Sequence, residues 1–235
     1  MSQNSNAYQS EQSKLAERLR PLADEVLRTL KEEYVTWLQE VEKIEVGEIE
    51  VEKGEKVPLY KLWRLMDPAT PTVGQSLESV MPANASSEVI NAYLFMDMCD
   101  FVTYALREAV GHILQNYKAN VKWVLYKPRP RFMLTEMGQE DPPRHSVLTV
   151  TDKNGKTYIM DLTHPQFGFR LLLLLDKDIY VKEYTNINEI PEVADSKLQT
   201  EMKELSEQHY DGLYQKLQER LTKMAKASVR IESAK

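Results

Sequence analysis

The sequence predicts an α+β fold, an antiparallel sheet packed by helices, and the order of its segments is the main reason. Helical stretches come first, a run of strand-like segments with no helix between them follows, and a helical stretch comes last. Consecutive strands are typical of antiparallel sheets, whereas parallel α/β folds alternate strand and helix. The dipeptide Asn154-Gly155 lies between two of the strands and is the best hairpin signal in the chain.

The composition is that of one globular domain spanning residues 1–235. Hydrophobic residues make up 42% of the chain and charged residues 28%, and the formal net charge is -6. This acidity argues against a general nucleic-acid-binding surface, which needs concentrated positive charge. No apolar run approaches the roughly 20 residues of a membrane-spanning helix, and the first residues do not form a signal peptide. We expect no membrane association and a cytoplasmic location.

Residues 10–66 predict a mainly helical N-terminal region behind a disordered polar tail, residues 1–9. Apolar residues recur every three or four positions in its first half, which predicts helix, and we expect Pro21 to kink or break that helix. Ile44–Val51 alternates enough to form a short strand. Val57–Met66 fits one or two helical turns.

Residues 86–184 predict a core of helix and antiparallel sheet, and a proline-containing loop precedes it. Ser86 and Ser87 are good N-cap residues for an apolar segment that runs to Tyr117, and Asp97 is a second cap candidate inside it. A further helix is expected over residues 195–230. The expected strands are Val121–Tyr126, Phe132–Glu136, His145–Thr151, Thr157–Leu162, Phe167–Leu175 and Ile179–Tyr184.

Three residues of this core suit cysteine-dependent acyl transfer. A thiol nucleophile needs a base and a group that orients the base, and the free N–H groups of a helix N-terminus favour a thiolate. If Asp97 caps a helix, Cys99 lies in its first turn. His145 opens one strand and Asp161 ends the next, so their side chains are expected to be cross-strand neighbours. We predict a catalytic triad of Cys99, His145 and Asp161.

The order of these residues resembles the transglutaminase-like branch of papain-fold cysteine proteins. The matching segments are Met98-Cys99-Asp100 with Ala105 and Leu106, Arg144-His145-Ser146-Val147, Tyr158-Ile159-Met160-Asp161-Leu162-Thr163, and Gln166-Phe167-Gly168. Similar Asp-x-Thr-x-x-Gln-aromatic-Gly segments occur in uncharacterised fungal proteins. The resemblance covers roughly residues 86–184 in motif order. Asp97 and Met98 depart from it, since family members usually carry Gly and often Trp there.

The resemblance implies a papain/transglutaminase-like core to which long N- and C-terminal helices are added. It also implies that Cys99 attacks a carboxamide or other acyl group, that His145 relays the proton and that Asp161 holds the imidazole. The reaction would be amide hydrolysis, transamidation or amide formation, and an aminoacyl-tRNA is one donor of the right chemistry. We expect no cofactor and no metal.

The remaining candidates concern substrate binding. Papain-like enzymes commonly build an oxyanion hole from a side-chain amide and the N–H of the cysteine, which makes Gln166 and Gln75 the candidate donors. Arg129 and Arg131 lie in a basic, proline-stiffened loop, and Arg144 precedes His145. These arginines suit an anionic substrate or the phosphates of an RNA. The expected substrate is a small molecule, a peptide or an aminoacyl group.

Each of these residues also has a structural interpretation. A lone cysteine on an apolar helix is most often a small buried hydrophobe, and Asp161 can cap the turn that follows it. The alternative function is a catalytically inactive papain-like binding or scaffold module that acts through its amphipathic ends, Leu22–Val41 and Leu198–Met224, in one option as a homodimer. A third option, a metal site at Asp161 and His164, has only two ligands.

Overall fold

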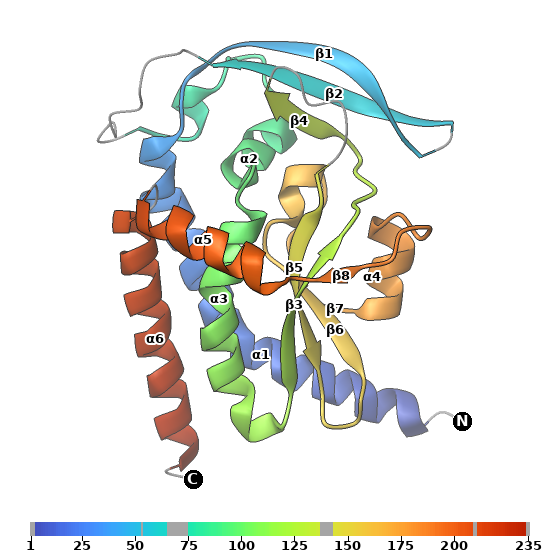
Figure 1. The fold of residues 1–235 in the computed structure, drawn as a ribbon, viewed down its shortest axis with the longest axis vertical. Helices are drawn as coiled ribbons and strands as arrows, with labels where there is room; N and C mark the ends of the chain where they lie inside the picture. Colours follow the sequence, from blue (N-terminus) through green and yellow to red (C-terminus); the bar gives the residue numbers. More distant parts are fainter. Residues whose placement is uncertain (1–2, 53, 65–74, 137–142, 209–210, 234–235) are drawn as a thin grey trace.

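The computed structural model describes residues 3–52, 54–64, 75–136, 143–208 and 211–233. It confirms the α+β fold with an antiparallel sheet (Figure 1). The helices are α1 (Gln3–Glu32), α2 (Ser87–Phe95), α3 (Cys99–Leu114), α4 (Lys177–Tyr184), α5 (Ser196–Gln208) and α6 (Asp211–Ser233). The strands are β1 (Val41–Glu52), β2 (Glu55–Arg64), β3 (Asn120–Tyr126), β4 (Met133–Glu136), β5 (His145–Thr151), β6 (Thr157–Asp161), β7 (Leu172–Asp176) and β8 (Glu192–Val193).

The central sheet has the strand order β7-β6-β5-β3-β8, and all its pairs are antiparallel. Successive side chains of a strand point to opposite faces, and here helices cover both faces. Trp123, Leu148 and Val150 belong to the main core, which includes α3, whereas Val124 and Val147 pack on Tyr180 of α4. This double cover explains why six successive residues of β5, from His145 to Val150, are all buried.

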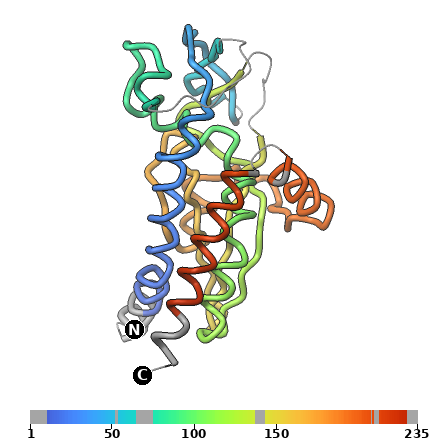
Figure 2. Tube along the Cα trace, turned by 90° about the vertical axis from the view of Figure 1, so that its left-hand side faces the viewer, coloured from blue at the N-terminus to red at the C-terminus, as the bar shows by residue number. Residues whose placement is uncertain are grey.

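The long terminal helices α1 and α6 lie side by side and cover α3 (Figures 1 and 2). Their apolar faces are buried in the main core, and ion pairs of Arg220 with Glu25 and of Lys216 with Glu33 join their exposed edges. Of the kink or break expected at Pro21, the break does not occur, because α1 continues through this residue. Packing of the flanking residues, including the fully buried Leu22, outweighs the hydrogen bond that proline removes.

The second sheet corrects the expectation of a mainly helical region over residues 10–66. The helical turns expected over Val57–Met66 are absent as far as Arg64, because these residues belong to β2, and residues 65–66 lie outside the described part. Strand β2 pairs antiparallel with the long β1 and parallel with β4. Val57 and Leu59 alternate with exposed residues and pack on Ile49 of β1. Short apolar runs do not distinguish a helical turn from a strand, so the sequence pattern misled here.

Further boundaries differ from the expectations. The one helix expected over residues 195–230 is two helices, α5 and α6. The described part of the predicted disordered tail is helical, since α1 begins at Gln3. Ile179–Tyr184 is not a strand but most of α4, which Asp176 caps by accepting a hydrogen bond from the N–H of Asp178. Phe167–Leu175 is strand only from Leu172 onward, because a 3-10 turn, η4 (His164–Phe167), precedes it.

No single helix in the described ranges is both long enough and apolar enough to cross a bilayer. The segments Ser87–Phe95 and Cys99–Tyr117 reach that length and apolarity only together, as a pair bent by 62°.

Candidate functional site

Cys99 is the first residue of α3, which confirms its expected place in the first turn of a helix. Helix α2, which Ser86 caps as predicted, ends at Phe95, and a tight turn connects it to α3. Asp97 lies in that turn with a left-handed φ of 60°, and Met98 occupies the N-cap position, so Asp97 is not the cap that the sequence suggested. The turn leaves the backbone N–H of Cys99 without an intrahelical acceptor.

His145 and Asp161 are brought together as predicted. The β5–β6 hairpin turns at Asn154-Gly155, where Gly155 has a φ of 82°. His145 Nε2 lies 2.8 Å from Asp161 Oδ2, and both side chains are almost completely buried. The hydrogen bond between the two side chains is therefore shielded from solvent.

Both oxygens of the Asp161 carboxylate accept hydrogen bonds. Oδ2 also accepts a hydrogen bond from the Tyr180 hydroxyl at 2.8 Å, and Oδ1 accepts from the N–H and hydroxyl of Thr163 at 3.1 and 3.4 Å. Burial alone would raise the pKa of Asp161, but attraction to His145 and these hydrogen bonds outweigh it, so the pKa is lowered. Asp161 is therefore an anion that fixes the position of the imidazole.

The other ring nitrogen of His145 faces the thiol. Asp161 occupies Nε2, so Nδ1 is the ring nitrogen left for the interaction with the Cys99 side chain that raises the pKa of His145. Gln166 Nε2 lies 2.9 Å from the same Nδ1, and Phe167 packs edge-on against the ring at 4.9 Å. Burial lowers the pKa of His145, but Asp161 and Cys99 raise it more, and the net shift is upward. These charges favour the protonated ring. Protonation at Nδ1 requires the Gln166 amide to turn its N–H away, because an amide N–H cannot donate to a protonated ring nitrogen.

A small hollow lies beside this cluster. Its volume is about 20 Å³, and its lining includes Gln166 and Phe167 from η4 together with Met96 and Asp97 from the turn before Cys99. A space of this size holds about one water molecule, and Cys99 itself is 8% exposed. In this conformation the hollow has no room for a group larger than water.

Of the predicted substrate-binding residues, only Gln166 reaches the triad. Gln75 donates a hydrogen bond to the carbonyl of Leu38 at 2.8 Å and holds the segment before β1, which rules it out as oxyanion donor in this conformation. Arg129 pairs with Glu55 at 2.8 Å, and Arg144 pairs with Glu192. Arg129 was expected in a basic loop and Arg144 beside His145, but carboxylates of β2 and β8 hold the two guanidinium groups.

Arg131 stands apart from the other arginines. Its guanidinium lies over the ring of Phe169 at 5.1 Å, and the described residues give it no carboxylate partner. Its backbone N–H donates to the carbonyl of Phe167, the residue that packs on His145. Arg131 is therefore the one predicted basic residue that borders the site with its charge free of an ion pair in the described chain.

His164 is a buried neighbour of the triad rather than a second base. Its Nδ1 lies 3.0 Å from the carbonyl of Arg170, and its ring stacks on Phe169 at 4.5 Å. Burial lowers its pKa, although Asp161 opposes this. Among the described residues, no group of three His, Cys, Asp or Glu side chains is placed to hold a metal ion.

The sequence missed several residues that support the triad, above all Tyr180 and Thr163. Thr163 follows Asp161 in a recognisable Asp-x-Thr turn, so a local signal was present. Tyr180 had none, because only the packing of α4 on the sheet brings its hydroxyl to Asp161.

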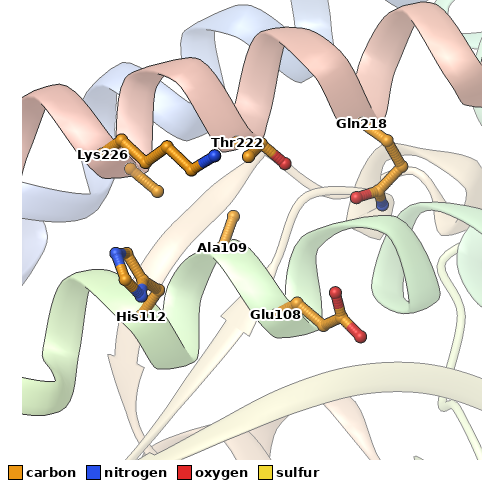
Figure 3. A pocket seen from close by; sticks show the side chains of 7 residues that line it. Glu108, Ala109, His112, Gln218, Thr222 and Lys226 are labelled. Atoms are coloured by element: carbon orange, nitrogen blue, oxygen red, sulfur yellow. The ribbon is translucent and has the colours of Figure 1, made fainter.

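A larger hollow, about 190 Å³, lies between α3 and α6 (Figure 3). Its lining includes Ala109, Glu108 and His112 from α3 and Thr222 and Lys226 from α6. None of the predicted site residues lines it. Its lining contains no cysteine, and Glu108 and His112 are the only two side chains there of the kinds that commonly bind metal ions.

Comparison with known proteins gives no match, whether to a protein-family model, to a curated protein or to a solved structure. The geometry of Cys99, His145 and Asp161 is therefore the basis for proposing a function.

Proposed function

We propose that this protein catalyses cysteine-dependent acyl transfer through Cys99, His145 and Asp161. The observation that supports this most strongly is the shared Nδ1 of His145, which faces both the thiol at the start of α3 and the amide of Gln166. A cysteine that served only as a core hydrophobe would not need a buried imidazole and an anchored carboxylate behind it.

The proposed reaction has two steps. The Cys99 thiolate attacks the carbonyl carbon of the donor and forms the C–S bond, and the His145 imidazolium gives its proton to the leaving group. Water or an amine then attacks the thioester, His145 takes up the proton of that nucleophile, and the C–S bond breaks to restore the thiolate. Asp161 stays ionised in both steps and holds the orientation of the His145 imidazole.

The oxyanion formed in each step needs donors. The backbone N–H of Cys99 has no acceptor among the described residues, and Gln166 Nε2 lies at the same side of His145 as the thiol. These two groups are the proposed oxyanion hole, the combination that the resemblance implied for Gln166. The substrate is a small molecule, a peptide or an aminoacyl group; Arg131 suits an anionic part of the donor, including the phosphates of an RNA.

The test uses the only cysteine of the chain as its own reporter. Iodoacetamide alkylation should be fast at pH 6 in the native protein and lose that rate in His145→Ala, while Thr149→Val, a matched change on the same strand, should leave it unchanged. An acetyl group from p-nitrophenyl acetate should then appear on Cys99 by mass spectrometry, with a burst of nitrophenol. A thiol that reacts only after unfolding would refute the proposal.

The second candidate is an inactive papain-like binding module, and the closed hollow beside Cys99 is the observation that favours it. The helical interface first expected for such a module has less support, because the apolar faces of α1 and α6 are buried against the core of the same chain. A native Cys99 that is inert at every pH, in a chain that stays folded, would favour the binding module.

A further inference from the structure

Beside the triad lies a second line of buried contacts that joins α3 to β5. Asp100 follows Cys99 on the helix, and Ser146 follows His145 on the strand. The hydroxyl of Ser146 donates a hydrogen bond to Asp100 Oδ1, and it accepts one from Trp123 Nε1 at 2.7 Å. The two residues that directly follow the nucleophile and the base are therefore bonded to each other.

The direction of this chain of hydrogen bonds is fixed by chemistry. An indole N–H can only donate, so the Ser146 oxygen must accept from Trp123 and its single proton is left for Asp100. Ser146 and Trp123 are almost fully buried, so water does not compete for the hydroxyl. Thr103, one turn after Cys99, adds a hydrogen bond to the Ser146 carbonyl at 3.2 Å. Two contacts thus attach the first turn of α3 to one residue of β5.

We propose that Asp100 is a positioning residue, and that the Trp123–Ser146–Asp100 chain sets the distance between the Cys99 sulfur and His145. This inference rests on the proposed function and adds the element that holds its geometry. Cys99 and His145 belong to different elements, α3 and β5, and lie far apart along the chain. Chain connectivity alone therefore does not fix the distance between them. The hydrogen bond between Asp100 and Ser146, the residues that follow them, joins the two backbones by a short path. A shift of about 1 Å between reacting groups can lower a rate on the order of 100-fold.

An electrostatic role for Asp100 is the competing explanation. Burial raises the pKa of its carboxyl, while the Ser146 hydrogen bond and the charge of His145 lower it, so the carboxylate does sense the imidazole. Asp100→Asn separates the two roles, because an amide oxygen still accepts from Ser146 but carries no charge. Asp100→Ala and Ser146→Ala both remove the hydrogen bond.

The experiment compares iodoacetamide alkylation of Cys99 at pH 6 and pH 9 in the native protein, in these three variants and in Thr149→Val. An unassisted thiol has a pKa near 8.5, so roughly 1 in 300 is ionised at pH 6. We expect Ser146→Ala and Asp100→Ala to lower the pH 6 rate about tenfold or more and to change the pH 9 rate little. Asp100→Asn and Thr149→Val should stay within about threefold of the native rate at both pH values.

Two results would overturn the inference. Native rates in Ser146→Ala would show that the brace does not position the sulfur, and a loss in Asp100→Asn as large as in Asp100→Ala would assign the effect to charge. If Asp100→Ala does not fold, Ser146→Ala, which removes a single buried hydroxyl, decides the question. A native protein that itself shows no His145-dependent rate at pH 6 would refute the proposed function instead, so the two failures are distinct.

Discussion

The buried pair of His145 and Asp161 should make the stability of the fold depend on pH, with a sign that follows from the two pKa shifts. Despite its burial, His145 has a raised pKa in the folded protein because Asp161 attracts the proton. The stability that protonated His145 gives the fold is complete below its pKa in the unfolded chain, about 6.5. This stability is lost as the pH rises through its pKa in the folded protein. The pKa of Asp161 is lowered, so its contribution is complete above about pH 4 and is lost on acidification.

The perturbation is the double substitution His145→Gln and Asp161→Asn, which keeps the shape and the hydrogen-bonding capacity of the pair and removes both titrating groups. It is made in a Cys99→Ala background and compared with Cys99→Ala alone, so that the thiol does not titrate in either protein. One proton taken up on folding changes the free energy of unfolding by about 1.4 kcal/mol per pH unit. Between pH 6.5 and 8.5 the difference between the two proteins should therefore shrink by up to about 2.7 kcal/mol.

The assay is urea denaturation at intervals from pH 4.5 to 8.5, with the free energy of unfolding extrapolated to water at each pH. Tyr180 and His164 are present in both proteins, so their titration largely cancels in the difference. The difference in free energy of unfolding between the two proteins should be nearly constant from pH 4.5 to 6 and should decline above pH 6. Two stability curves that stay parallel from pH 6 to 8.5 would mean that His145 is neutral in the fold, and the thiolate–imidazolium reasoning would lose its basis.

Two further substitutions test the surroundings of the pair. Tyr180→Phe removes the hydroxyl that donates to Asp161 at 2.8 Å, and it should lower the free energy of unfolding by about 1.5–3 kcal/mol in urea denaturation; an unchanged midpoint would show that the hydroxyl contributes nothing to the pair. Gly168→Ala should destabilise more than Gly54→Ala. Both glycines have φ near 80°, but a Cβ at Gly168 would lie 2.6 Å from the Phe132 ring whereas Gly54 has open space. Equal shifts in melting temperature would contradict this.

The local sequence carried enough information for the parts of the site that depend on one element. The pairing of His145 with Asp161 follows from strand alternation and the Asn154-Gly155 turn. The sequence offered Asp97 as the cap before Cys99, and the structure has Met98 at that position. Gln166 was reached only through the resemblance. Its contact with His145 depends on how η4 folds back after β6.

The expectations that failed share one cause. Each was based on the local sequence of a segment whose conformation depends on its pairing or packing with distant residues. Val57–Arg64 became β2 because β1 and β4 supply partners on both sides, and residues 179–184 became α4 because Tyr180 and Val181 pack on the sheet. Pro21 stays inside α1 because the core holds its neighbours. Local propensity is a weak preference, and burial against distant residues overrides it.

The sequence by itself determined the α+β class, the central hairpin and the order Cys99, His145, Asp161. Only the tertiary structure decided which groups complete the site, because Tyr180, the Trp123–Ser146 contact and the ion pairs that occupy Arg129 and Arg144 all join residues far apart in the chain. Spacing along one segment fixes which face a side chain occupies. Which residue a side chain contacts on that face depends on how the elements pack, and their positions depend on the whole core.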